Sequence, residues 1–359
     1  MTAAAYLGGL EAAELVDVTN DPSALDSSGW WAVVVTFEGT VTCARFANVR
    51  ARTASVQGRW LGPPAGAWTS SMSQPMYTGS VDTVRELIAR GDVYQANVCR
   101  LLQARLPDPE QADVSALASV LSVGNPAPYS GYIRLPADAH PLLPPGGVHI
   151  ATASPEQFIR RDGDYIESSP IKGTGRTAAD LLPKDEAENI MIVDLVRNDL
   201  SPVCQVGSVE VPSLLRIEEH PGLVHLVSTV SGRLIPGLGW ADMFASAFPP
   251  GSVTGAPKVS ALRIIRELEP VDRGPYCGAI GWVDADRKVG ELAVGIRTFW
   301  LAGAATRRDR HPLVRFGTGA GITWGSDPER EWDETELKAS RLVGLASRTV
   351  DRPAIGSVR

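Results

Sequence analysis

The sequence lacks any run of apolar residues long enough to cross a membrane, which would need roughly 18 to 20 of them in succession. Its first 21 residues include Glu11 and Glu14 but no Lys or Arg, so the charge pattern of a secretory signal is missing. We therefore expect a cytoplasmic protein that does not associate with membranes.

Cysteine is scarce. The chain has four, at positions 43, 99, 204 and 277, and no two of them form a CxxC pair. Such wide spacing argues against a zinc knuckle and against the disulfide framework of a small secreted domain. A reducing compartment suits this sequence best.

Positive charge is also in the minority. Lys and Arg total 34 against 41 Asp and Glu, which gives 34 − 41 = −7, and no basic tract stands out. A nucleic-acid binder would show such a tract, so we expect no nucleic-acid partner. An anionic substrate would need a bound metal ion or a few well-placed cations to hold it.

The remaining pattern is mixed α and β, without internal repeats. Alternating or continuous apolar residues predict strands at 31–37, 147–153 and 279–283, with a turn at 284–287 and a return strand over 290–300. Residues 1–75 are expected to add strands to the same fold, and the proline-rich stretch 136–147 is expected to be a loop. Apolar residues at helical spacing predict helices at 81–90, 184–197, 257–268 and 328–345.

Two predicted helices carry paired carboxylates. Glu331, Glu334 and Lys338 are spaced i, i+3 and i+7, and Asp185 and Glu188 are spaced i, i+3, so each set shares one helix face. Two such faces could hold Mg²⁺, which typically takes one or two carboxylates together with water and substrate oxygens. The alternative is a pair of solvated faces with an ordinary i, i+4 pair between Glu334 and Lys338.

A glycine-rich stretch, 316–322, precedes the last predicted helix. Its glycines would let backbone N–H groups converge on an anion, although a tight turn without a ligand remains equally open. Its G-x-G-x-G spacing opens no βαβ unit, which argues against dinucleotide binding. Arg297, in an apolar predicted strand, must lie at an edge or be buried with a partner such as a carboxylate.

Lys172, Glu156 and His225 are ambiguous when read alone. A lysine nucleophile has to be the neutral amine, and most lysines are simply exposed. A glutamate that follows a strand can be a general acid, but a surface position is commoner. His225, in an apolar setting, is by default a core histidine.

In order, several blocks of this sequence resemble the chorismate-binding enzymes: anthranilate synthase component I, aminodeoxychorismate synthase component I, and the isochorismate and salicylate synthases. The resemblance runs from about residue 77 to 345. It rests on the blocks 91–97, 154–156, 170–174, 192–199, 225–232, 251–258, 276–281, 317–322 and 327–338.

The resemblance implies an α+β fold in which two large antiparallel sheets pack face to face with helices outside, and a catalytic core over 76–350. It implies Mg²⁺ as cofactor, bound by Glu188 and Glu334 with Glu331 and Asp185 in support. The residues that it assigns to substrate binding are Arg297, Tyr276, Thr174, His225, Gln95, Lys338 and the backbone of Gly319, Ala320 and Gly321.

Within the family, the nucleophile differs. Members that add water typically have a lysine where this chain has Gln95, and anthranilate synthases usually have alanine where this chain has Lys172. Lys172 is typical of aminodeoxychorismate synthases. The resemblance therefore implies that chorismate and ammonia give 4-amino-4-deoxychorismate, the precursor of 4-aminobenzoate in folate biosynthesis, with Glu156 as acid and Lys172 as covalent nucleophile.

Ammonia is expected from a separate glutamine amidotransferase subunit, because the chain shows no nucleophile-elbow cysteine motif and no spare length for a glutaminase domain. Two alternatives stay open: anthranilate synthase component I, and a catalytically silent chorismate-binding regulatory subunit.

Overall fold

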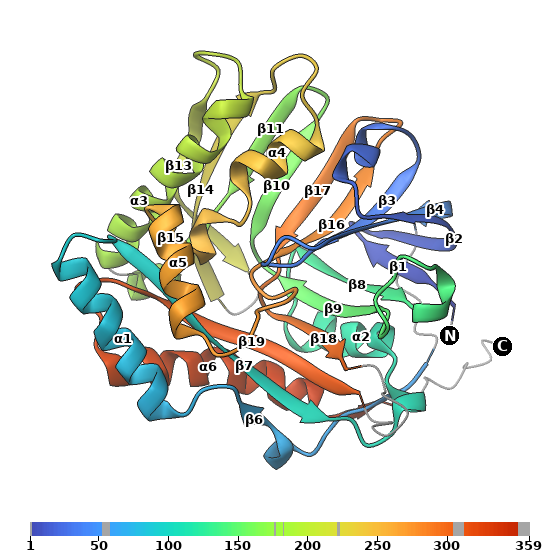
Figure 1. Cartoon of the computed structure of the whole chain (residues 1–359), viewed down its shortest axis with the longest axis horizontal. Helices are drawn as coiled ribbons and strands as arrows, with labels where there is room; N and C mark the ends of the chain where they lie inside the picture. Colours follow the sequence, from blue (N-terminus) through green and yellow to red (C-terminus); the bar gives the residue numbers. More distant parts are fainter. Residues whose placement is uncertain are drawn as a thin grey trace.

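The computed structural model describes residues 2–51, 58–175, 177–181, 183–220, 223–303 and 312–350. Strands dominate this part of the chain (Figure 1). They are β1 (Ala4–Leu7), β2 (Leu10–Thr19), β3 (Trp30–Val35), β4 (Val41–Ala51), β5 (Trp60–Leu61), β6 (Thr69–Ser70), β7 (Gln95–Arg105), β8 (Tyr129–Leu135), β9 (Val148–Ser154), β10 (Gln157–Asp162), β11 (Tyr165–Ser169), β12 (Ile171–Gly175), β13 (Glu210–His220), β14 (Leu223–Arg233), β15 (Gly255–Ala256), β16 (Ala279–Asp284), β17 (Val289–Val294), β18 (Thr298–Ala302), β19 (Leu313–Ile322) and β20 (Thr349–Val350).

The α-helices are α1 (Gln74–Ala89), α2 (Val114–Gly124), α3 (Pro183–Leu200), α4 (Trp240–Ala247), α5 (Lys258–Leu268) and α6 (Pro328–Ala346). Short 3₁₀ helices are η1 (Pro22–Asp26), η2 (Ala65–Ala67), η3 (Pro109–Gln111), η4 (Ala137–Ala139), η5 (Ala178–Asp180), η6 (Ser201–Val203) and η7 (Gly251–Val253).

Eighteen of the described strands form one continuous antiparallel sheet, which we call the ladder below. From β13 it runs through β14, β11, β10, β17, β16, β3, β4 and β2. It continues through β1, β8, β9, β18 and β19 to β7, with β12 beside β14 and with β15 and β6 beside β7. The antiparallel α+β architecture expected from the sequence is confirmed, although hydrogen bonds join its two halves into one ladder.

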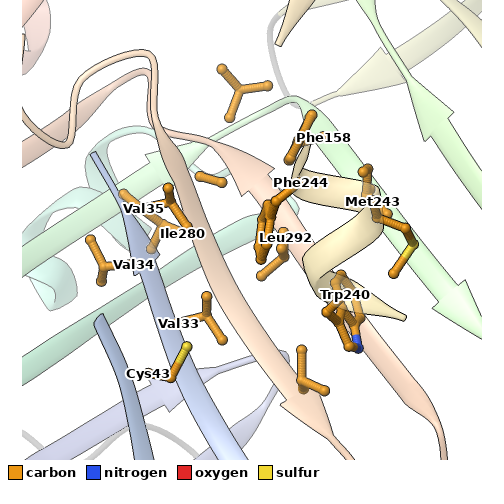
Figure 2. Close-up of a cluster of buried hydrophobic side chains, with 14 of the residues drawn as sticks. Val33, Val34, Val35, Cys43, Phe158, Trp240, Met243, Phe244, Ile280 and Leu292 are labelled. Carbon is orange, nitrogen blue, oxygen red and sulfur yellow. The ribbon is translucent and has the colours of Figure 1, made fainter. Parts of the chain in front are cut away.

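Buried strands form the main hydrophobic core. All six residues of β3 are buried, as expected for a central strand that is covered on both faces. Figure 2 shows Phe244 of α4 beside Leu292 of β17 and near Phe158 of β10, and Trp240 and Met243 of the same helix belong to the same buried cluster. This shared hydrophobic cluster holds α4 against one half of the ladder.

The helices cover the outside of the ladder. In Figure 1, α1 and α6 lie along β7 and β19, and α5 packs against β7 and β15. On the other half, α3 packs against β12 and β14, and α4 packs against α3. A stripe of buried residues on α6, spaced three or four apart, faces β19: Thr335, Ala339, Leu342 and Ala346. The Asp327 side chain caps this helix by accepting a hydrogen bond from the Arg330 amide at 3.0 Å.

Most predicted elements are present with shifted ends. The helix expected at 81–90 begins seven residues earlier, at Gln74, because Ser73 caps it and buried Tyr77 anchors its first turns. Tyr77 donates to the Val98 carbonyl at 3.2 Å and stands edge-on to Trp332. These are tertiary contacts, so the local residues alone could not indicate them.

One prediction about the C-terminal strands is wrong, and one of two open alternatives is excluded. The return strand expected over 290–300 is broken between β17 and β18, because Arg297 has a left-handed φ of +51° and the chain changes pairing partners there. The glycines 317–321 do not form a tight turn, since they lie within β19 and pair along β7.

In the part of the chain that the structure describes, no helix is both long and apolar enough to cross a membrane.

Candidate active site

Glu156 and Arg297 lie where the chain crosses between the two halves of the ladder. Glu156 links β9 to β10, and Arg297 lies between β17 and β18. Backbone hydrogen bonds hold the crossings together: the Ala153 amide donates to the Arg297 carbonyl at 3.1 Å, and the Val294 amide donates to the Glu156 carbonyl at 3.0 Å. These bonds place two residues that are 141 positions apart in sequence (297 − 156 = 141) at the boundary between the two halves of the ladder, which we call the seam.

Glu156 is a buried acid. Only 4% of it is exposed, so the surface alternative considered from the sequence is wrong. Burial raises the pKa of Glu156 to about 7, and it is opposed by hydrogen bonds from Ser252 and the Ile171 amide and by the charges of Lys172 and Arg297. A carboxyl group with that pKa can donate a proton near neutral pH.

Arg297 is half-buried beside this acid. Burial lowers the pKa of Arg297, the Glu156 charge opposes that effect, and the nearby Arg341 lowers it further. Arg341 lies on α6, one helical step beyond Lys338, and it was not among the residues expected from the sequence. The two guanidinium groups create a positive region next to Glu156, which suits a carboxylate ligand.

Lys172 lies on β12, half-buried and within electrostatic range of Glu156. The next residue, Gly173, has a φ of +82°, and a Cβ there would approach Asp185 of α3 to 2.9 Å. Thr174 pairs with His225 of β14 in the ladder, and His225 is buried. The side chain of Thr174 lies outside the described part of the structure.

The glycine-rich segment of β19 presents an open edge. Cys99 lies opposite Gly319 on β7, and its backbone N–H donates to Glu269 Oε1 at 2.9 Å. Cys99 and Gly319 are therefore a pair without backbone hydrogen bonds to each other. The Gly319 carbonyl instead accepts from Lys338 Nζ at 3.1 Å. By the alternation of the ladder, the N–H groups of Gly319 and Gly321 also point away from β7, and described pairing with β18 ends at Phe316.

Tyr276 lies flat against this strand. A Cβ on Gly317 would fall inside the Tyr276 ring, so only glycine permits the contact. Burial is the main cause that raises the pKa of Tyr276, which keeps its hydroxyl protonated and able to donate a hydrogen bond. Ala320, by contrast, is buried in the cluster on the opposite face of β19.

The four acids predicted to bind metal lie on two helices, Asp185 and Glu188 on α3 and Glu331 and Glu334 on α6. Among the described residues, no group of three or more His, Cys, Asp or Glu is close enough to hold a metal ion. Two carboxylates suffice for Mg²⁺ when water and substrate oxygens complete its shell, so the hard oxygen donors present fit that ion. Glu334 also forms the predicted i, i+4 pair with Lys338, at 2.7 Å.

A groove of about 280 Å³ lies away from these residues, on the face of β7 that carries Arg100 and Leu102. Trp68, Arg100, Trp332 and Glu336 contribute to its lining, and it includes none of the residues predicted for the site. The buried Arg100 guanidinium is occupied by Thr335, Ser70 and Glu336 and stacks over Trp332 at 4.1 Å. The candidate catalytic residues therefore lie at the seam and not in this groove.

Sequence reasoning missed Ser252, Asn97 and Arg341. Ser252 hydrogen-bonds to Glu156, and Asn97 Nδ2 faces the Ser252 carbonyl at 3.5 Å. The i, i+3 spacing of Arg341 after Lys338 was a readable signal. Nothing in the sequence linked Asn97 to Ser252, because 155 residues separate them.

The fold is shared with isochorismate synthases and with an anthranilate synthase component I. The menaquinone-specific isochorismate synthase of Escherichia coli superposes with a TM-score of 0.74 at 17% identity, over 97% of this chain and 89% of that one. A model of the chorismate binding enzymes matches residues 44–344. The chain belongs to the chorismate-binding enzyme family.

Its relatives carry two different names. An anthranilate synthase component 1 of Haloarcula marismortui is 38% identical over 301 residues, which cover 79% of this chain and 56% of that protein. The aminodeoxychorismate synthase component 1 of Escherichia coli is 34% identical over 332 residues, which cover 87% and 68%. The chain spans 52% to 56% of the length of several anthranilate synthase relatives.

Proposed function

We propose that this protein is a component I of aminodeoxychorismate synthase, which converts chorismate and ammonia to 4-amino-4-deoxychorismate for 4-aminobenzoate and folate biosynthesis. The observation that carries the proposal is the proximity of Lys172 to the buried acid Glu156. A potential nucleophile beside a proton donor is the pair that displacement of a hydroxyl group requires.

In the first step, protonated Glu156 gives its proton to the departing C4 hydroxyl while neutral Lys172 attacks C2 of chorismate. A C2–N bond forms, the two conjugated ring double bonds shift, the C4–O bond breaks, and water leaves. In the second step, ammonia attacks C4, the two double bonds shift back, and the electron pair of the C2–N bond returns to Lys172. The new C4 ammonium group then loses a proton, which restores protonated Glu156. Covalent catalysis thus divides one difficult substitution into two easier ones.

Other residues would bind and orient the substrate. Arg297, the Tyr276 hydroxyl and the open amides of Gly319 and Gly321 can hold carboxylate groups, because all of them donate hydrogen bonds. Glu188 and Glu334, with Glu331 and Asp185, would hold Mg²⁺. When bound, that ion supplies positive charge to a substrate carboxylate.

Thr174, His225 and Lys338 complete the proposed ring pocket and carboxylate contacts. Ammonia would come from a separate glutamine amidotransferase subunit, as the component I names of the relatives suggest.

The test is product identification. The protein is incubated with chorismate, Mg²⁺ and an ammonium salt, and the product is measured by mass and by coupling to a lyase that releases 4-aminobenzoate. We expect 4-amino-4-deoxychorismate. Formation of anthranilate and pyruvate would support the second candidate, anthranilate synthase component I, which the 38% identical relatives favour.

The covalent step has a separate readout. Without ammonia, intact-protein mass should increase by chorismate minus water, and Lys172→Ala should abolish that increase. Lys288→Ala, which removes an exposed lysine from the β16–β17 turn, is the matched control and should retain it. A wild-type protein that turns over chorismate without any adduct would assign Lys172 an electrostatic role. No turnover of any kind would support a silent regulatory subunit.

A further inference from the structure

A buried ion pair that has no part in the proposed mechanism joins α3 to the start of α5. Asp199, near the end of α3, is 7% exposed, and its Oδ2 accepts a hydrogen bond from Lys258 Nζ at 2.8 Å. Burial raises the pKa of Asp199 to about 6, and the Lys258 charge opposes that effect. The two residues end the sequence blocks 192–199 and 251–258, so the ion pair connects these blocks in the folded chain.

Lys258 also closes the segment 247–258, which carries Ser252. Its Nζ donates a second hydrogen bond, to the Ala247 carbonyl at 3.0 Å. One ammonium group therefore holds the two ends of this segment together and ties both of them to α3.

The closed segment packs on Asp199 and reaches Glu156. A Cβ on Gly251 would be 3.4 Å from Asp199 Oδ2, so the backbone just before Ser252 lies against that carboxylate. Ser252 is 6% exposed and hydrogen-bonds to Glu156. All four residues line one cavity of about 10 Å³, which is no larger than a single water molecule needs. The contacts are thus continuous from the ion pair to the acid.

The residues that follow Ser252 are held from another direction. The Asn97 amide of β7 donates to the Thr254 carbonyl at 2.8 Å, and Arg273 Nη1 donates to the Val253 carbonyl at 2.9 Å. The backbone before Ser252 has the ion pair as its corresponding support.

We propose that the Asp199–Lys258 ion pair positions Ser252, so that the Ser252 hydroxyl donates a hydrogen bond to the Glu156 carboxylate. This proposal rests on the proposed function, in which Glu156 is the acid. Asp199 and Lys258 are positioning residues, because they act through Ser252 and not on the substrate.

The position of this hydroxyl has a chemical consequence. A hydrogen bond to the ionised carboxylate favours the ionised form, so Ser252 limits the rise in the Glu156 pKa that burial causes. Glu156 can then both give a proton to the departing hydroxyl group and accept one from the new ammonium group near neutral pH. The Ile171 amide and the charges of Lys172 and Arg297 act in the same direction, and they are present in every variant below.

The test is a titration of Glu156 in the folded protein, followed by NMR of the carboxyl carbon of labelled glutamate, with Glu156→Gln to identify the signal. Ser252→Ala should raise the Glu156 pKa by about one unit, as expected for one lost hydrogen bond to a charged group. Lys258→Met should also raise it, and Lys258→Arg, which keeps a donor for Asp199, should restore the wild-type value. Arg263→Met removes an exposed cation from α5 and is the matched control, which should titrate as wild type.

A double variant separates positioning from a direct effect of charge. Lys258→Met leaves the Asp199 charge unpaired, and a nearby negative charge would by itself raise the Glu156 pKa. That direct effect would persist without the hydroxyl, so Ser252→Ala/Lys258→Met would then titrate above Ser252→Ala. We expect the two to titrate together, because the group through which Lys258 acts is already missing.

Titration at the wild-type value in folded Ser252→Ala or Lys258→Met would overturn the proposal, and so would additive shifts in the double variant. Should Lys258→Met not fold, Asp199→Leu/Lys258→Met removes both charges and gives the same comparison. The titration needs no substrate, so its result is independent of the proposed function, which fails if wild-type protein forms no aminated product. In active protein, the same shifts should appear in the alkaline limb of kcat/KM for chorismate.

Discussion

Replacement of Glu156 by Gln should make the protein more stable at alkaline pH while it removes the proposed proton donor. Glu156 is buried, and burial raises its pKa from 4.5 to about 7. A raised carboxyl pKa means that the folded state binds the proton more tightly than the unfolded state. This contribution to stability is fully present below pH 4.5 and is lost as the pH rises through about 7.

The magnitude follows from the two pKa values. Each pKa unit corresponds to 1.36 kcal/mol, so wild-type protein should lose about 3 kcal/mol of unfolding free energy through this residue between pH 4.5 and 8. Glu156→Gln does not titrate. Its unfolding free energy relative to wild type should therefore increase by about that amount over the same range.

The assay is urea unfolding of both proteins at several pH values from 4.5 to 8. Asp199, whose pKa burial raises to about 6, contributes in the same direction, but it is present in both proteins and cancels in the difference. A difference that does not vary with pH would refute the assignment of a buried, protonated Glu156. In the same variant, amination should fall by about 10²- to 10⁴-fold, the usual contribution of a general acid.

Three further changes test the site and the core. Gly317→Ala places a methyl group in the Tyr276 ring, so we expect a loss of about 1–3 kcal/mol in urea unfolding and a higher KM for chorismate. Glu269→Gln leaves buried Arg273 without its 2.6 Å ion-pair partner, and the free energy of unfolding should fall by about 3–5 kcal/mol. Removal of divalent metal with EDTA should abolish amination until Mg²⁺ is restored, and Glu334→Gln should raise the Mg²⁺ requirement about tenfold.

Each of the two stability variants has a control nearby in the sequence. Gly325→Ala, the control for Gly317→Ala, adds a methyl group into open space. It should leave the unfolding free energy and the KM for chorismate unchanged. Glu267→Gln removes an exposed partner of Arg263 and should alter unfolding by less than about 1 kcal/mol. If these controls lost as much stability as the test variants, close packing at Gly317 and the buried charge of Arg273 would not be the causes.

Local pattern was sufficient for the elements and for the family. The helices that carry Glu188 and Glu334 were readable from apolar spacing, because a helix face repeats every 3.6 residues whatever it packs against. The motif that contains Lys172 could be recognised in the sequence because its residues, 170–174, follow one another directly. The strand after which Glu156 appears was equally local.

The burial and partners of those side chains were decided by tertiary structure. Nothing near Glu156 in sequence specifies its burial, which comes from segments as distant as Ser252 and Arg297. The break in the strand at Arg297 follows from a change of pairing partners.

The unpaired amide atoms of the buried Gln95 and Asn97 side chains show the same limit most clearly. The sequence by itself determined that Gln95 and Asn97 alternate on one strand with apolar residues, which places them on one face. Their lack of partners depends on Gly321 and Ser252, more than 150 residues away in the chain. Hydrogen bonds and burial are properties of atoms brought together by folding, so only the tertiary structure could show that these amide atoms have no partner among the described residues.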